Sequence, residues 1–123
     1  MREVLWVGLG GFVGANARYL LDGWIAARLG SAFPYGTFVI NVTGSFILGL
    51  IMGTLETHVF SPAVRLTLGI GFVGAYTTFS TWTYETLRLL ENGSVLLATV
   101  NVVGSLLVGL LAAMGGLAAG RVL

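Results

Sequence analysis

Long apolar segments, rather than any catalytic motif, constrain what this chain can fold into. Crossing the hydrocarbon core of a bilayer, which is about 30 Å thick, takes about 20 predominantly apolar residues in a helix. Segments of that length fill the sequence and are joined by short links; they cover residues 4–29, 37–55, 63–90 and 95–117. With 56% hydrophobic and only 9% charged residues, the chain is predicted to be an all-α integral membrane protein, a single domain (1–123) with four transmembrane helices.

The third segment contains polar residues where the middle of a membrane span should be apolar. The run from Gly69 to Trp82 reads GIGFVGAYTTFSTW, so closely spaced glycines lead into hydroxyls and aromatic rings. Irregular backbone at this depth survives only where it is buried in protein or lines a water-filled path, and the hydroxyls compete with the hydrogen bonds of the helix. We therefore predict a break in the third helix between Gly74 and Thr78, with freed carbonyls that suit a hard cation.

Polar residues also recur four apart on one face of the second and fourth segments. Thr37, Asn41 and Ser45 form the first stripe, and Asn101 and Ser105 belong to the second. Such stripes either form hydrogen bonds between helices, which we favour for Ser45, or line a polar path. Asn41 is harder to explain by packing, because a mid-span amide has two donors and an acceptor to satisfy.

Two aromatic residues follow the predicted break. Phe79 and Trp82 are three apart and therefore share one helix face. The positive edges of aromatic rings can contact an anion without holding it tightly; core packing would be the preferred explanation if hydroxyls did not surround the pair. No carboxylate lies at the centre of a span, which disfavours a proton-coupled antiporter and favours an anion path lined by neutral donors.

One arginine, Arg18, lies inside the first segment. An arginine at that depth is costly unless it reaches the interface or faces a cavity. We expect its side chain to snorkel and pair with Asp22, one turn away. The functional alternative is a fixed positive charge in a vestibule, where it would concentrate anions.

The remaining arginines give no orientation in the membrane. With four spans, Arg2, Arg65 and Arg121 fall on one side and Arg18, Arg28 and Arg88 on the other. The positive-inside rule therefore predicts no preference. Such a chain either inserts both ways or takes one orientation from a weak preference of its first helix.

Several motifs follow one another along the chain. They are GGFVGANARY from Gly10, FPYGT from Phe33 with Asn41 and Gly44 after it, and GFVG from Gly71 running into TTFST. In this order they resemble the Fluc (CrcB) family of bacterial and archaeal fluoride channels, and the likeness covers essentially the whole chain. It implies a fluoride-selective channel, not an enzyme, that lets fluoride leave passively through the cell inner (plasma) membrane. The family's members are antiparallel, dual-topology homodimers with two pores.

The resemblance also implies roles for individual residues. A structural central sodium ion would bind the backbone carbonyls of Gly74 and Thr77 at the helix break. Arg18 would supply the vestibule charge. The fluoride pore would be lined by Asn41, Phe79, Trp82 and Ser105, with Thr37, Ser80 and Thr81 as neighbours.

This sequence departs from the family pattern at two positions. Trp82 stands where a second phenylalanine is usual, and its indole keeps the ring edge but adds bulk and an N–H donor. Asn101 stands at the position where some members have a tyrosine on the last helix, and we consider it as a substitute donor.

Two other kinds of membrane protein share some of these features. A small multidrug-type exporter shares the size and the four spans, but it needs a glutamate inside its first span, and residues 9–17 contain none. A non-transporting membrane assembly subunit would explain the glycine-rich packing motifs. It would leave the amide stripes and the TTFST run without a purpose.

Overall fold

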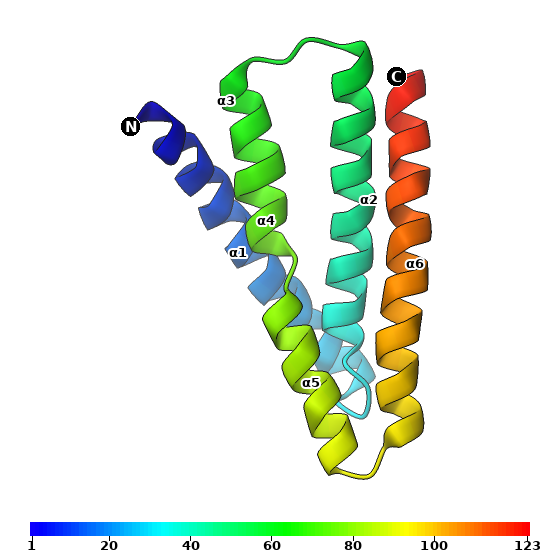
Figure 1. The fold of residues 1–123 in the computed structure, drawn as a ribbon. Helices are drawn as coiled ribbons and strands as arrows, with labels where there is room; N and C mark the ends of the chain where they lie inside the picture. Colours follow the sequence, from blue (N-terminus) through cyan, green and yellow to red (C-terminus); the bar gives the residue numbers. More distant parts are fainter.

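Helices make up the structure of this chain. The computed structural model describes residues 1–123 and contains no strand. In chain order the elements are α1 (Arg2–Leu29), α2 (Tyr35–Thr57), α3 (Pro62–Arg65), the π-helical η1 (Leu66–Val73), α4 (Gly74–Tyr76), α5 (Phe79–Glu91) and α6 (Val95–Val122) (Figure 1). Three of them, α1, α2 and α6, are long and apolar enough to cross a membrane. The expectation of an all-helical chain with several membrane-spanning helices is confirmed; the predicted third span is divided among α3, η1, α4 and α5.

The chain passes up and down through the bundle, so successive spans run in opposite directions (Figure 1). The N-terminus, the link between α2 and α3, and the C-terminus lie at one end of the bundle, and the other two links lie at the opposite end (Figure 1). Helices α1 and α5 are followed by Gly30 (φ 75°) and Gly93 (φ 74°). Both glycines have left-handed backbone, which ends a helix at little steric cost.

Glycines bring α2 and α6 into backbone contact along most of their length. A Cβ on Gly49 or Gly53 would collide with the backbone of α6, and a Cβ on Gly116 or Gly120 with the backbone of α2. Close approach of this kind is how helices associate in lipid, where no hydrophobic force drives them together. This pair has the most extensive contact in the molecule.

A second glycine contact joins α1 to η1. Gly10 and Gly14 lie against the backbone of Thr67 and Phe72, and Gly71 lies against the backbone of α1. Gly10 and Gly14 form a GxxxG, a spacing that lets helix backbones approach closely, and here it packs α1 against η1.

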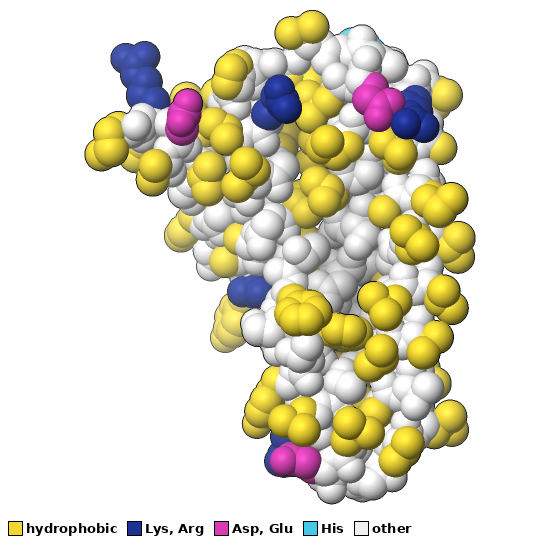
Figure 2. Space-filling model, viewed as in Figure 1, with side chains coloured by type: hydrophobic (Ala, Val, Ile, Leu, Met, Phe, Trp, Pro, Cys, Tyr) yellow, Lys and Arg dark blue, Asp and Glu magenta, His cyan; other side chains and the backbone are white.

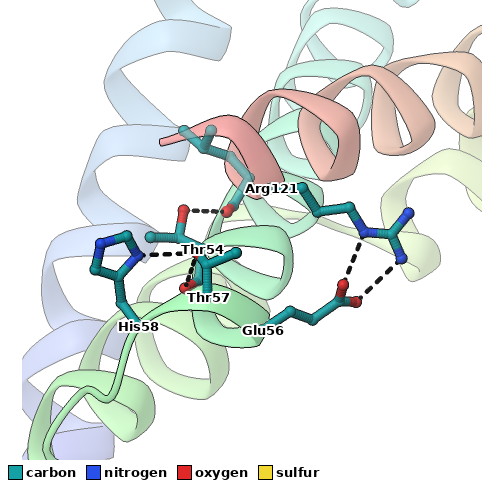
Figure 3. Close-up of polar contacts among 6 residues, drawn as sticks. Thr54, Glu56, Thr57, His58 and Arg121 are labelled. Carbon is teal, nitrogen blue, oxygen red and sulfur yellow. Dashed lines mark hydrogen bonds and ion pairs between the residues drawn. The ribbon is translucent and has the colours of Figure 1, made fainter.

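Charged side chains gather mainly at the two ends of the bundle, and apolar side chains cover much of the wall between them (Figure 2). At one end, Arg121 at the end of α6 donates two hydrogen bonds to Glu56 at the end of α2, at 2.7 and 3.2 Å (Figure 3). At the other end Arg88 pairs with Glu91 at 2.8 Å. This distribution is the one expected of a chain that spans a bilayer.

The expected ion pair between Arg18 and Asp22 is wrong. The only ion pairs are those at the ends of the bundle. The Asp22 carboxylate instead lies against the Cα of Gly36 in the first turn of α2. A helix N-terminus carries partial positive charge, which favours a carboxylate there.

Candidate functional site

The centre of the molecule contains a short extended segment between two helices. Helix α4 ends at Tyr76 and α5 begins at Phe79; between them Thr77 has φ −77° and ψ 157°, and Thr78 has φ −147° and ψ 116°. The Thr78 hydroxyl caps α5 by accepting from the backbone N–H of Thr81 at 3.3 Å, and it donates to the Thr81 hydroxyl at 2.9 Å. This side-chain cap satisfies a donor that the start of a helix leaves free.

Asn41 on α2 holds this segment at two points. Its Nδ2 donates to the Thr78 carbonyl at 3.0 Å, and its Oδ1 accepts from the Thr78 N–H at 2.8 Å. The amide thus replaces both partners that a continuous helix would have given Thr78. Since the Thr77 N–H bonds to the Val73 carbonyl, neither Thr77 nor Thr78 donates to the Gly74 carbonyl.

A groove of about 300 Å³ lies beside this segment, between α2, α5 and α6. Its lining includes the backbone of the extended segment, and none of its side chains carries a charge. Of the residues to which the family resemblance gave a role in ion binding, five line it: Asn41, Thr77, Phe79, Trp82 and Ser105. They come from α2, the extended segment, α5 and α6, so the fold brings part of each predicted polar stripe to the aromatic pair, while Thr37 and Asn101 lie elsewhere.

The aromatic pair lies on one side of the groove. The ring centroids of Phe79 and Trp82 are 5.5 Å apart, with an angle of 45° between the rings. Phe79 is 75% exposed on the surface of the single chain. The indole Nε1 of Trp82 donates to the Asn101 backbone carbonyl at 3.2 Å, so its N–H is already bonded to α6.

Comparison with known proteins places the chain in a family. The family model described as CrcB-like protein, Camphor Resistance (CrcB), matches residues 5–117.

The chain belongs to the CrcB family.

Relatives in this family are similar along nearly their whole length. A protein of Geotalea daltonii named fluoride-specific ion channel FluC is 49% identical over 122 residues, which are 98% of each chain. A protein of Acidobacterium capsulatum with the same name is 52% identical over 120 residues, 97% of this chain and 96% of its own. A Geobacter sulfurreducens protein, again of that name, is 46% identical over 122 residues, 98% of each chain.

The other residues that the CrcB resemblance singled out lie outside the groove. Thr37 is buried in the first turn of α2, and Ser80 and Thr81 are exposed on the first turn of α5. Gly74 is exposed, with open space where a side chain would project. Arg18 is half-buried on α1. Their roles in ion binding stay predictions.

Sequence reasoning missed the polar contact between α5 and α6. Asn101 is fully buried, and its Nδ2 donates to the Thr86 hydroxyl at 2.9 Å. Its side chain does not line the groove, so the interpretation of Asn101 as a substitute donor in the pore has no support in the geometry. The polar stripe of α6 indicated Asn101, but no periodicity pointed to Thr86. The contact between Asn101 and Thr86 depends on how α5 and α6 pack.

Proposed function

We propose that this chain is a fluoride-specific ion channel through which fluoride leaves the cell passively. The observation that carries the proposal is the name shared by relatives with about half of their residues identical over nearly the whole chain. The groove at the helix break supplies the chemistry that such a function needs. It combines neutral hydrogen-bond donors with aromatic edges and contains no charged side chain.

The groove's donors suit a small, strongly hydrated anion. A selective path has to replace the water lost by fluoride with closely spaced hydrogen bonds. One of the two N–H groups of the Asn41 side chain donates to the Thr78 carbonyl, so the other can donate to an ion. The Ser105 hydroxyl has no partner in the chain, and the edges of Phe79 and Trp82 would complete the coordination.

The residues that line the groove also fit passive flow of fluoride. Coupling fluoride export to protons would require a titratable side chain in the path. The lining residues are amide, hydroxyl, aromatic, aliphatic and glycine residues. Fluoride would therefore move down its own electrochemical gradient.

The working assembly would be an antiparallel, dual-topology homodimer in the cell inner (plasma) membrane. In a single chain the groove opens at the surface and leaves Phe79 largely exposed. A second copy would close the groove and cover the ring. The even division of arginines between the two sides of the membrane supports insertion in both orientations.

A structural sodium ion would lie at the broken third span. The fit rests on the Gly74 carbonyl, which receives no hydrogen bond from Thr77 or Thr78 because their N–H groups bond elsewhere. Backbone carbonyls are hard oxygen ligands suited to Na⁺ at discontinuous helices. Those of Gly74 and Thr77 would bind the ion, which would neutralise their dipoles where the two subunits meet.

Ion efflux from liposomes tests the function directly. Purified protein in vesicles loaded with fluoride or chloride should release fluoride rapidly and chloride far more slowly. A multidrug-type exporter would instead carry organic cations in exchange for protons, and an assembly subunit would carry no ion. Absence of fluoride efflux from an intact dimer would overturn the proposal.

Phe79→Ile tests the aromatic role. The variant should assemble as the wild type does and lose fluoride flux, because an aliphatic side chain lacks the positive ring edge. Phe12→Ile is a matched control, since Phe12 on α1 is 73% exposed and lies outside the groove. Wild-type flux in Phe79→Ile would remove the aromatic role.

Two further measurements test the assembly. In a population of molecules, a C-terminal tag should be found on both sides of the cell membrane. A tag found on one side only would contradict dual topology. Replacing sodium with a bulky organic cation should lower the thermal stability of the dimer. Equal stability in both salts would exclude the sodium role.

A further inference from the structure

Ser105 is an exception among the hydroxyl side chains of these helices. Every other serine or threonine beyond the first turn of a helix donates to a carbonyl three or four residues earlier, as Thr43, Ser45, Thr54, Thr57, Thr67, Thr83, Thr86 and Thr99 do. This bond is the usual way for such a side chain to satisfy itself. The Ser105 Oγ is buried and has no partner.

The carbonyl four residues before Ser105, the position that all of these side chains except Thr57 use, is already occupied. Four residues before Ser105 lies Asn101, whose carbonyl accepts the indole N–H of Trp82 at 3.2 Å. A carbonyl oxygen has two lone pairs, and inside α6 one of them serves the helix's own ladder. The indole takes the other, so none is left for the Ser105 hydroxyl.

A closed set of hydrogen bonds fixes the indole in this position. Thr86 donates its proton to the Trp82 carbonyl at 2.8 Å and therefore accepts from the Asn101 amide at 2.9 Å. These two contacts to Asn101 join α5 to α6. Asn101 thus orients the helix that carries both aromatic rings.

We propose that Trp82 is a positioning residue for Ser105: its indole N–H occupies the Asn101 carbonyl and so keeps the Ser105 hydroxyl free to donate to fluoride in the groove. The inference rests on the proposed function, because it assigns the freed proton to that ion. Both Trp82 and Ser105 line the groove. Without the indole N–H, the Ser105 proton would turn back to the Asn101 carbonyl and leave the path.

Fluoride flux through the single and double variants at Trp82 and Ser105 tests whether the two residues act together. Trp82→Phe and Ser105→Ala should each slow fluoride efflux about tenfold, as loss of one hydrogen bond to a charged group does, and the double variant should be no slower than either. Thr99→Ala is the matched control, since it removes a back-bonded hydroxyl from the exposed face of α6. Wild-type flux in Trp82→Phe, or multiplied losses in the double variant, would overturn the proposal.

A spectroscopic readout tests the hydrogen bonding without any flux. The chain has no cysteine, so Ser105→Cys introduces a single thiol with its own infrared S–H stretching band. Adding Trp82→Phe should shift that band to lower wavenumber, because the thiol then bonds to the vacated carbonyl. An unchanged band would overturn the proposal.

The two readouts also separate this inference from the proposed function. If the wild type carries no fluoride, the proposed function fails, while the S–H band still reports whether Trp82 controls the partner of residue 105. Should Trp82→Phe not assemble, Trp82→Leu carries the infrared test, because it also lacks the N–H.

Discussion

Two regions of this molecule hold helices together by opposite means. Helices α2 and α6 touch backbone to backbone through glycines along most of their length. Helix α5 has far less contact with its neighbours. It is held by the Asn41 bonds to Thr78 at its start and by the Asn101 bonds further along.

The first kind of contact fixes the distance between two helices, and the second kind fixes the orientation of one helix. Close packing of backbones fixes a distance between helices and tolerates no added atom. A few directional hydrogen bonds fix the orientation of a helix whose outer face stays open. The α2–α6 pair therefore acts as the frame, and α5 presents the aromatic rings to the groove.

The largest expected effect comes from adding one methyl group to the frame. Gly116→Ala places a Cβ against the Phe46 carbonyl and the Leu50 nitrogen, so the free energy of unfolding should fall by about 3 kcal/mol, the upper part of the range for overpacking. Unfolding in mixed detergent micelles measures it. Gly115→Ala is the control, because no atom lies within 4 Å of its added Cβ; equal losses in both variants would contradict the backbone contact.

A smaller loss of stability is expected at the other region, together with a loss of function. Asn41→Leu leaves the N–H and the carbonyl of Thr78 without partners, which should lower the free energy of unfolding by about 2 kcal/mol and stop fluoride flux. Hydrogen exchange at the Thr78 amide should accelerate. Asn41→Asp should slow that exchange again, since a carboxylate still accepts from this N–H.

The control for Asn41 is another helical amide. Asn16 is exposed and bonds only to the Phe12 carbonyl of its own helix, so Asn16→Leu should change stability little. If Asn41→Leu were as stable as Asn16→Leu and kept fast flux, the two-point contact would not position α5.

An intermediate effect is expected from the cap of α5 alone. Thr78→Val keeps the side-chain shape but removes the acceptor for the Thr81 N–H, which should cost about 1 kcal/mol of stability. Hydrogen exchange at the Thr81 amide should accelerate while the Thr78 amide stays protected by Asn41. Thr83→Val, whose hydroxyl bonds only within its own helix, should leave both amides unchanged.

The smallest change in stability is expected from the ion pair that joins the ends of α2 and α6. Glu56→Gln removes the ion pair with Arg121, whose two side chains are both about half exposed (51% and 53%). Exposed pairs contribute little and are screened by salt, so the unfolding transition should barely move. A large shift that persists at high salt would show that α2 and α6 depend on this pair rather than on their glycines.

The helices and one of their close contacts could be predicted from residue spacing. The apolar segments predict helices that cross a membrane, and the GxxxG at Gly10 predicts a close contact with another helix, which is present against η1. The change from glycines to hydroxyls pointed to the region around Thr77 and Thr78, where the backbone is extended. These features depend on neighbours in sequence, which is why periodicity and composition reveal them.

The contacts that place α5 could not be predicted in the same way. Periodicity put Asn41 and Asn101 on polar faces, but it did not show that Asn41 holds Thr78, that Asn101 accepts from Trp82, or that Asp22 turns to Gly36 instead of Arg18. Each of these contacts joins different helices, and its geometry depends on how closely their backbones approach. The sequence by itself therefore determined the membrane class and the all-helical fold with its long apolar helices. Only the tertiary structure decided which donors bond to neighbouring helices and which have no partner in the chain.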